Sequence, residues 1–495
     1  MPSTRTTFGT VAAFLLVVMF IADCQSSGGL PTWIKELAGE SANARDAQIA
    51  SSVPQPEHCS GSEGSLKASV DPNIAYQTID GFGTSVRLFD DPHLTKTFDQ
   101  NTRRSAAIIP KADQNKILNL LYREMGLTMA RPVIEGMIEP LNDNSDPNAT
   151  DLSKFHFSWK GGDGYITYVK RAARVGLRDY FLAPLLPETW MTEGNPAEYV
   201  EYAMALLLHW KSQGLEMPYY SIYNEPGYFQ GRTTRSGEFL RDVIRLLGPR
   251  ISAAGLKTKI VVPDEIRSSI AAQKSMVILS DPVARQYVGA LATHLYDEPL
   301  VNMRAMKQLS QQYNIPLWMT EFSIHALDTA GIRQRDYLAW AGLMHQLLVD
   351  YNVSAIFYLW GFFGQWSENS SLIQIENRGS TYLGFAPQKA LFAMGQFARY
   401  ARPGSTRISV SYAIDPAILI SAFKSRTAVS VIAINNGPSR QIVLSLLGKQ
   451  AGPVRGTRTS DTEDFVPVTI YCRRGSEVVL VLPSRSITSV MIDYK

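Results

Sequence analysis

The chain has 495 residues and a net charge of +3, with 45% apolar and 19% charged residues. This composition is that of a soluble globular protein, and the charge is too small to indicate nucleic acid or an anionic membrane as a partner. The length exceeds one typical domain, so we expect two folded units and a tail.

Residues 1–24 have the pattern of a signal peptide. Arg5 is followed by an unbroken apolar run from Val11 to Ala22. This run is short for a membrane span, which needs about 20 residues. We therefore expect a cleaved signal peptide and a secreted, extracellular or periplasmic protein, with a membrane anchor as the alternative. Residues 25–63 are rich in Ser, Gly, Ala and Pro and are expected to form a flexible linker.

From residue 78 to 402, strand-like and helix-like segments alternate. The expected strands cover residues 78–85, 128–133, 180–184, 218–224, 258–262, 288–294, 315–321 and 354–360. Helical spacing is found at residues 115–125, 164–175, 196–213, 237–254, 300–313, 332–350 and 387–398. Eight strands separated for the most part by helices predict an α/β fold, a (β/α)8 TIM barrel.

The last part of the chain, residues 403–495, has a different texture. It is rich in Val, Ile, Ser and Thr and is broken by turns such as Asn436-Gly437 and Arg474-Gly475. Short strands at regular spacing without helices predict an appended antiparallel β-sandwich. Residues 64–77 alternate weakly and are expected to form an opening strand or two.

Two of the expected barrel strands end in a glutamate. Glu225 closes the fourth strand, in the stretch Tyr219 to Tyr228, and Glu321 closes the seventh. The carboxyl ends of barrel strands form the face that carries the chemistry in such enzymes. Two carboxyl groups there are what a glycosidase needs, one to protonate the leaving oxygen and one to attack the sugar. Taken alone, Glu225 could also be an ordinary acid at a helix N-terminus.

Five stretches, in this order along the chain, resemble glycoside hydrolase family 30, in the clan of retaining β-glycosidases. They are Gln77–Ser85, Asn224–Pro226, His294–Tyr296, Leu317–Ser323 and Gln396–Gly404. Asn-Glu-Pro alone is shared across the clan, whereas the whole series is specific. The resemblance implies that a sandwich packs on the barrel and that residues 64–77 join the sandwich.

The resemblance also implies a role for each matching residue. Glu225 would be the acid/base and Glu321 the nucleophile, with their carboxyl groups about 5 Å apart. Asn224 would bind the sugar's 2-hydroxyl, Arg131 would keep the nucleophile ionised, and Tyr296 would contact the nucleophile. Trp360 would form the aromatic floor of the −1 subsite.

Three further side chains are interpreted from their position. His294 is expected to be a hydrogen-bonding histidine of the core or cleft, because no second ligand stands at metal-binding spacing. Trp190 follows the third strand and is expected to be a sugar platform, with core packing as the alternative. Trp318 lies three residues before Glu321, so strand alternation predicts that it points outward and packs between barrel and helices.

Two segments depart from the family pattern. Where the family often has Pro-Pro-Ala-Trp-Met, this chain has Leu-Pro-Glu-Thr-Trp-Met, which places Glu188 near the barrel mouth. We expect Glu188 either to touch substrate or to pair with an arginine. The segment 89–111 after the first strand is also atypical.

The expected function is a secreted retaining β-glycoside hydrolase that acts on a β-linked polysaccharide, with xylan or glucuronoxylan favoured. β-1,6-Glucan and glucosylceramide are the other substrates that the resemblance allows. The alternative is a carbohydrate-binding protein on the same fold whose catalysis has lapsed. We expect no cofactor, no metal ion, no specific protein partner and a monomer.

Because the N-terminal strand and the sandwich should be neighbours, Cys59 is expected to bond Cys472, with two unrelated thiols as the alternative.

Overall fold

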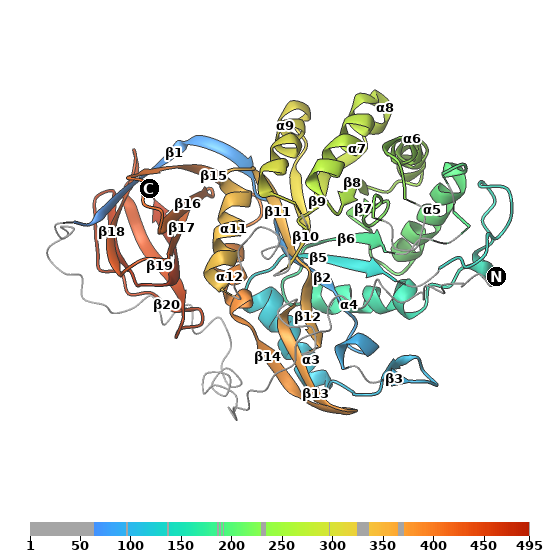
Figure 1. Ribbon diagram of the computed structural model, residues 1–495, viewed down its shortest axis with the longest axis horizontal. Coiled ribbons are helices and arrows are strands. Elements are labelled where there is room, and N and C mark those ends of the chain that lie inside the picture. Colours follow the sequence, from blue (N-terminus) through green and yellow to red (C-terminus); the bar gives the residue numbers. More distant parts are fainter. Residues whose placement is uncertain are drawn as a thin grey trace, which may run out of the picture. The chain divides into compact units, whose positions relative to one another are not determined.

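The fold is known from a computed structural model (Figure 1). It describes residues 64–494 except for 96–97, 136–137, 186–187, 189, 192, 229–233, 297, 324–335 and 365–370. The predicted signal peptide, linker and Cys59 therefore lie outside the described residues. In the part of the chain that is described, no helix is long and apolar enough to cross a membrane.

A closed barrel of eight strands forms one half of the described fold, and all neighbouring strands are parallel. The strands, in barrel order, are β10 (Leu317–Phe322), β11 (Val353–Tyr358), β2 (Gly81–Val86), β5 (Met129–Ile134), β6 (Asp179–Pro184), β7 (Tyr219–Ser221), β8 (Lys259–Glu265) and β9 (Val288–His294). The predicted TIM barrel is confirmed.

Helices follow the strands around the outside of the barrel (Figure 1). They are α3 (Lys111–Leu118), which continues into the π-turn η2 (Asn119–Glu124), α4 (Asp163–Ala173), α5 (Pro196–Ser212), α6 (Gly237–Ala253), α7 (Ser268–Ser280), α8 (Pro282–Arg285), α9 (Met303–Tyr313), α11 (Tyr337–Val349) and α12 (Lys389–Ala398). The sequence analysis missed α7 and α8. Small Ser and Ala residues make up much of α7, so its buried residues form a weak apolar pattern.

The barrel interior is filled by a cluster of inward-pointing side chains. Its members are Met129, Phe181, Ala183, Val261, Ala290, Ala292, Trp318, Ala355 and Phe357. The prediction that Trp318 points outward is wrong. The pairing of β10 shifts register after Met319, towards both β9 and β11. This irregularity breaks the simple two-residue alternation, so Trp318 and Glu321 do not have to point to opposite faces. The indole Nε1 of Trp318 donates to Asp80 at 2.7 Å.

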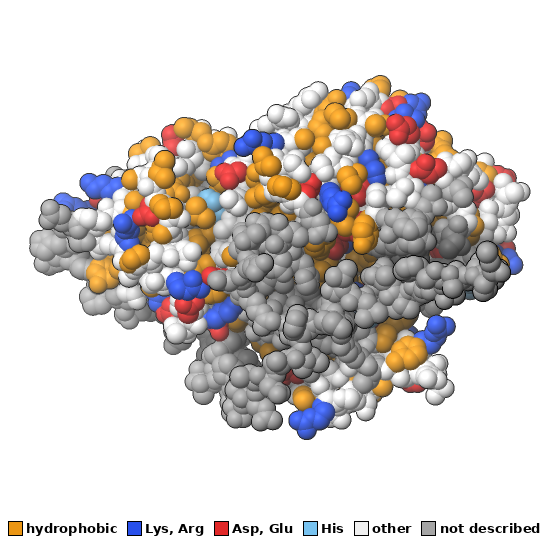
Figure 2. Space-filling view, viewed as in Figure 1, with side chains coloured by type: hydrophobic (Ala, Val, Ile, Leu, Met, Phe, Trp, Pro, Cys, Tyr) orange, Lys and Arg blue, Asp and Glu red, His pale blue; other side chains and the backbone are white. Residues whose placement is uncertain are grey.

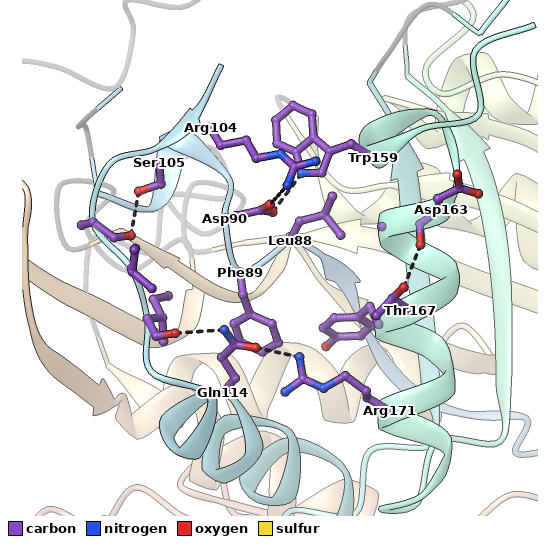
Figure 3. A pocket seen from close by; sticks show the side chains of 15 residues that line it. Leu88, Phe89, Asp90, Arg104, Ser105, Gln114, Trp159, Asp163, Thr167 and Arg171 are labelled. Atoms are coloured by element: carbon purple, nitrogen blue, oxygen red, sulfur yellow. Dashed lines mark hydrogen bonds and ion pairs between the residues drawn. The ribbon is translucent and has the colours of Figure 1, made fainter. Parts of the chain in front are cut away.

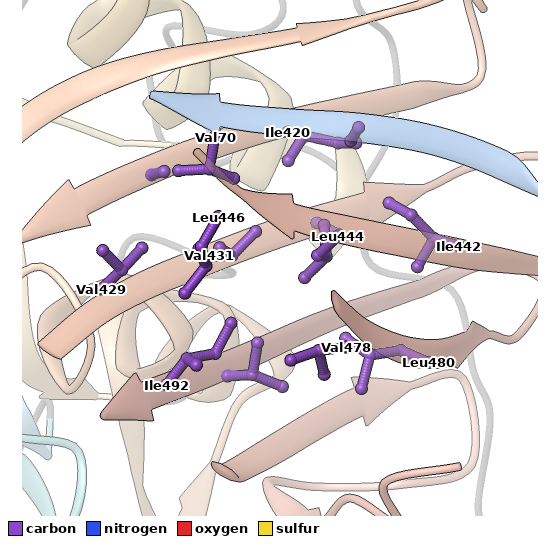
Figure 4. Close-up of a cluster of buried hydrophobic side chains, with 14 of the residues drawn as sticks. Val70, Ile420, Val429, Val431, Ile442, Leu444, Leu446, Val478, Leu480 and Ile492 are labelled. Atoms are coloured by element: carbon purple, nitrogen blue, oxygen red, sulfur yellow. The ribbon is translucent and has the colours of Figure 1, made fainter. Parts of the chain in front are cut away.

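A ten-stranded sheet forms the second half, in the order β20-β19-β23-β17-β16-β15-β1-β18-β22-β21. The strands are β1 (Leu66–Thr78), β15 (Thr406–Tyr412), β16 (Ile418–Lys424), β17 (Ala428–Asn435), β18 (Arg440–Leu446), β19 (Ala451–Ser460), β20 (Val466–Pro467), β21 (Cys472–Arg474), β22 (Glu477–Leu482) and β23 (Ser486–Tyr494). Inward side chains from across this sheet meet in one apolar core (Figure 4). The predicted appended sandwich is thereby confirmed.

The opening strand β1 lies inside the sandwich sheet. It pairs antiparallel with β15, and it pairs parallel with β18, where Leu66 faces Ile442. Gln77, near the end of β1, donates to the carbonyl oxygens of Leu348 at 2.7 Å and Val353 at 3.1 Å. The strand therefore ties the sandwich to α11 and β11 of the barrel.

Helices α11 and α12 fill the space between barrel and sandwich. α11 contacts β16, β17 and β23, and α12 contacts β19 and β23. Gln396 of α12 is buried against Thr459. Cys472 of β21 is in a disulfide bond, and its predicted partner Cys59 lies outside the described residues. On the face shown in Figure 2, acidic and basic side chains are interspersed.

Two strand-to-helix connections at the carboxyl end of the barrel carry extra strands. The connection from β2 to α3 contains the turn η1 (Pro92–Leu94) and the small hairpin β3 (Phe98–Asp99) and β4 (Arg104–Ser105). The connection from β11 to α12 contains β12 (Trp360–Gly364), β13 (Ser371–Arg378) and β14 (Thr381–Pro387). Asn377 of β13 donates to the Thr95 carbonyl at 2.6 Å, so the two connections touch.

Candidate active site

Glu225 is held at the carboxyl end of β7 by the two neighbouring strand ends. The amide of Asn224 donates to Pro184 O at 2.9 Å, and the amide of Glu225 donates to Asp264 O at 2.9 Å. Glu225 has a φ of +52°, a left-handed backbone that is uncommon for a residue with a side chain. Its side chain is only 8% exposed, so its carboxyl group is largely removed from solvent. Backbone strain of this kind is frequent at functional sites.

Glu321 near the end of β10 receives hydrogen bonds on both oxygens. Arg131 Nη1 of β5 donates to Oε2 at 2.8 Å, and the Tyr296 hydroxyl donates to Oε1 at 2.9 Å. Arg131 is fully buried, whereas the Glu321 side chain is 14% exposed. Donors on both oxygens favour the ionised carboxylate, which is the form required of a nucleophile.

His294 at the end of β9 lies between the two glutamates. Its Nδ1 is 2.8 Å from Glu225 Oε1 and 3.9 Å from Glu321 Oε2. Its other nitrogen, Nε2, is 3.3 Å from Asp264 Oδ1. His294 thus acts as a buried hydrogen-bonding residue of the site.

Asp264 on β8 was missed in the sequence analysis. Its carboxylate accepts from Arg131 Nη2 at 3.0 Å, Ser221 Oγ at 2.9 Å and Thr320 Oγ1 at 2.6 Å. Like Glu225, it has a left-handed backbone, with φ +56°. A carboxylate two residues after the expected strand 258–262 was the available signal, similar to the one that identified Glu225.

The charges of the site explain two pKa shifts. Burial opposes protonation of His294, but the negative charge of Glu321 and the hydrogen bonds to Asp264 and Glu225 raise its pKa to about 10. Burial also opposes ionisation of Asp264, but the charge of Arg131 and the contact with His294 hold its pKa well below the ordinary value. The His294 ring is therefore protonated at neutral pH, with its Nδ1 facing Glu225.

Asn224 also belongs to this network. Its side-chain oxygen accepts a hydrogen bond from Arg131 Nη2. With the oxygen oriented towards Arg131, the amide N–H groups of Asn224 are the donors that can meet a hydroxyl group of a bound sugar.

The two predicted aromatic platforms lie at the same end of the barrel but have partners of their own. Trp190, in the connection after β6, donates its Nε1 to the Glu139 carbonyl at 2.8 Å. The Arg87 guanidinium lies 3.7 Å from the centre of the Trp360 ring, and Phe363 stacks beside that ring. One face of Trp360 is thus covered by a cation.

Glu188, the departure from the family pattern, is buried under the connection after β5. Its Oε1 accepts from the Glu139 amide at 2.9 Å. Trp190 donates to the carbonyl of the same residue, so Glu188 and Trp190 both form hydrogen bonds with the backbone of Glu139. The roles expected for Glu188, contact with substrate or pairing with an arginine, stay predictions.

Among the residues that the structure describes, two groups of carboxylates and histidine converge closely enough to be considered as metal ligands. One is Glu225, His294 and Glu321, and the other is Asp91, His93 and Glu135. In the first group, Arg131 and Tyr296 already donate to Glu321. In the second group, Arg87 and Lys160 each form ion pairs with both Asp91 and Glu135. Protein cations thus compensate carboxylates in both groups.

The separation of the two glutamates is short. The facing carboxylate oxygens of Glu225 and Glu321 lie within 4.8 Å of one another. Of the predicted site residues, the structure brings Arg131, Asn224, Glu225, His294, Tyr296 and Glu321 into one hydrogen-bonded cluster. Trp190 and Trp360 lie outside this hydrogen-bonded cluster.

Curated proteins with similar sequences are glycosidases by name. A putative glucosylceramidase 2 of Caenorhabditis elegans is 23% identical over 421 residues, which covers 75% of this chain and 77% of that protein. Glucuronoxylanase XynC of Bacillus subtilis strain 168 is 24% identical over 305 residues, 60% of this chain and 66% of that protein, so the match spans slightly less than two thirds of its length. No family model matches the chain.

Solved structures share the fold at low sequence identity. An endoxylanase of glycoside hydrolase family 30 from Clostridium papyrosolvens has a TM-score of 0.65 and 20% identity, covering 86% of this chain and 100% of that one. The catalytic domain of xylanase C from Talaromyces cellulolyticus has a TM-score of 0.66 and 23% identity, covering 86% and 99%. An endo-β1,6-glucanase has a TM-score of 0.65 and 18% identity, covering 87% and 94%. Together with the curated relatives, these neighbours support the resemblance to glycoside hydrolase family 30 found in the sequence.

Proposed function

We propose that the chain is a secreted β-glycosidase that works with retention of configuration, through a covalent glycosyl-enzyme. The observation that carries this proposal is the approach of the Glu225 and Glu321 oxygens to within 4.8 Å. Retaining glycosidases hold their carboxyl groups about 5–5.5 Å apart, whereas inverting enzymes need about 6.5–9.5 Å to admit a water.

In this mechanism Glu321 attacks the anomeric carbon. Its two hydrogen bonds, from Arg131 and Tyr296, fix the direction of its carboxyl group. The transition state has the character of an oxocarbenium ion. Three carboxylates, Glu225, Asp264 and Glu321, surround the two cations Arg131 and protonated His294. The site therefore carries a net negative charge that favours the positive charge developing on the sugar.

Glu225 protonates the leaving oxygen in the first step and removes a proton from water in the second. The proton that it delivers can occupy Glu225 Oε1 or His294 Nδ1, two positions 2.8 Å apart. Because His294 Nε2 is directed towards Asp264, the Nδ1 atom is the one that exchanges a proton with Glu225.

The substrate that we propose is a β-linked polysaccharide of the xylan or glucuronoxylan type. Relatives named glucuronoxylanase and endoxylanase support it. Other relatives are named putative glucosylceramidase and endo-β1,6-glucanase. Secretion is proposed from the apolar run at Val11–Ala22 that follows Arg5. The presence of Arg131, Asn224 and Tyr296 around both glutamates argues against a lapsed site.

Substitution of the two glutamates tests the mechanism. Glu321→Ala should abolish turnover, whereas Glu225→Ala should still hydrolyse aryl β-glycosides whose leaving group needs no proton. Added azide should then give a β-glycosyl azide from the Glu225→Ala enzyme, because azide attacks the covalent intermediate. Proton NMR of the wild-type reaction should show a β-configured first product, and an α-configured one would exclude retention. Product analysis on glucuronoxylan, xylan, β-1,6-glucan and glucosylceramide identifies the substrate.

A further inference from the structure

A cavity of about 440 Å³ is lined by none of the residues of the catalytic cluster (Figure 3). Its walls come from the atypical connection between β2 and α3, from Gln114 of α3, from Trp159 and from α4. Leu88, Ile108 and Tyr168 provide apolar surface, and Asp90, Arg104 and Gln114 provide polar groups. A volume of about 300–1,000 Å³ with mixed apolar and polar walls is typical of a small-ligand site.

Trp159 lines this cavity with a strained backbone. Its φ is +48°, which a bulky residue rarely adopts. Its indole Nε1 donates to Asp90 Oδ1 at 2.9 Å, and Arg104 pairs with Asp90 Oδ2 at 3.2 Å. The Asp90 and Arg104 side chains are 41% and 48% exposed, so both can form further hydrogen bonds to a ligand. Strain of this kind persists where surrounding contacts enforce it, and it is frequent at ligand sites.

The cavity is connected to the catalytic side through neighbouring residues. Arg87 precedes Leu88 in the chain, and Lys160 follows Trp159. Both cations bind Glu135, and the Arg87 guanidinium also lies over Trp360. The cavity and the predicted −1 platform thus flank the same buried group of charges.

The lining favours a sugar over a hydrocarbon chain. An aromatic ring next to a carboxylate and a guanidinium offers a flat apolar face and directional hydrogen bonds, which match the two kinds of surface on a pyranose ring. A hydrocarbon chain would remove the exposed side chains of Asp90 and Arg104 from water without offering their remaining polar atoms a hydrogen bond. We propose that this cavity binds a saccharide unit of a β-linked polysaccharide, at a distance from the bond that is cleaved. The proposal rests on the proposed function for the class of polysaccharide.

The test uses the full chain carrying Glu321→Gln, so that the ligand is not hydrolysed. Titration calorimetry with β-1,4-xylohexaose and with β-1,6-glucohexaose measures binding, and the matching disaccharides serve as short ligands. Trp159→Asn removes the ring while tolerating the left-handed backbone. We expect it to weaken binding of at least one hexasaccharide by about tenfold, with a smaller effect on the matching disaccharide. Phe98→Ala is the matched control, because Phe98 lies on the β3–β4 hairpin that carries Arg104 but does not line the cavity.

Arg104→Ala is the second variant, because its exposed side chain can be removed without disturbing the core. Unchanged hexasaccharide affinity in both Trp159→Asn, verified as folded by its melting curve, and Arg104→Ala would overturn the proposal.

If binding survives when the wild-type nucleophile is blocked by a covalent fluoroglycoside, the cavity holds an independent chain. Loss of Trp159-dependent binding in that blocked enzyme means that one chain spans both sites. Failure of the wild type to hydrolyse any glycoside would refute the proposed function without touching this binding result.

Discussion

Asp264 is the residue on which the hydrogen bonds of the catalytic cluster converge. It holds Arg131 and His294, which in turn contact the nucleophile and the acid/base. Its own backbone carbonyl also fixes the amide of Glu225. A buried carboxylate with four donors is therefore the structural centre of the site, although it is not placed to touch a sugar.

Asp264→Asn should destabilise the protein and slow catalysis. The amide would place N–H groups against existing donors and leave Arg131 with one carboxylate fewer. Breaking a buried ion pair costs about 3–5 kcal/mol. Urea unfolding should show this loss, and kcat measured well below the melting temperature should also fall. Ser221→Ala, which removes one neutral donor, is the control and should cost about 1 kcal/mol.

Glu139 gives a second prediction at this scale, through pH. Burial and the negative charges of Asp143 and Glu201 raise its pKa to about 8, against an ordinary value of 4.5. The folded state therefore keeps this proton over a pH range in which the unfolded state has lost it. Its contribution to stability is fully present below pH 4.5 and is lost as the pH rises towards 8.

Glu139→Gln should reduce the loss of folding stability between pH 4.5 and 8. The difference in melting temperature between wild type and variant should widen from pH 4.5 to 8 in favour of the variant. Glu238→Gln, an exposed carboxyl group on α6, should show a much smaller pH-dependent difference. A difference that stays constant across this pH range would contradict the assignment.

At the scale of elements, the sequence predicted the barrel because strands and helices have different apolar periods. Seven of the helical segments stood out for this reason, and the glutamates at two strand ends marked the site. Alternation failed where pairing is irregular, since the register shift in β10 cannot be read from one strand alone. The contacts of Asp264 were missed, because its partners come from other elements and no local pattern encodes those contacts.

Substitution of Trp318 tests whether its side chain points into the barrel, as the irregular register of β10 allows. If its ring fills the barrel interior against Phe181 and Phe357, Trp318→Ala should cost about 3–5 kcal/mol of unfolding free energy. Asp80 would also lose the indole that donates to it. Chemical denaturation measures the cost. Tyr471→Ala, at an exposed aromatic residue of the sandwich, should stay within about 0.5 kcal/mol of wild type.

At the scale of the whole molecule, barrel and sandwich depend on a shared layer of helices. In α12, Leu391, Phe392, Met394 and Phe397 are all buried. Arg407 of β15 also donates to Asn352, which lies between α11 and β11 of the barrel half, at 2.9 Å. Each half thus covers apolar surface of the other.

A fragment of residues 78–402 should therefore not form a stable barrel. Loss of the sandwich would expose the faces of α11 and α12 that contact β16, β17, β19 and β23. We expect aggregation in size-exclusion chromatography and no cooperative transition in calorimetry, because exposed apolar patches of this kind promote association. A soluble fragment with a sharp melting transition would show that the barrel is independent.

The place of β1 has a consequence for how the protein is made. This strand leaves the ribosome before any barrel strand, yet its partners β15 and β18 are among the last segments to be synthesised. Domains usually fold as units during synthesis, from the N-terminus onward. Here β1 remains unpaired until its partners β15 and β18 have been synthesised. Pairings between such distant segments slow folding, so β1 is a segment on which a chaperone or an export factor has time to act.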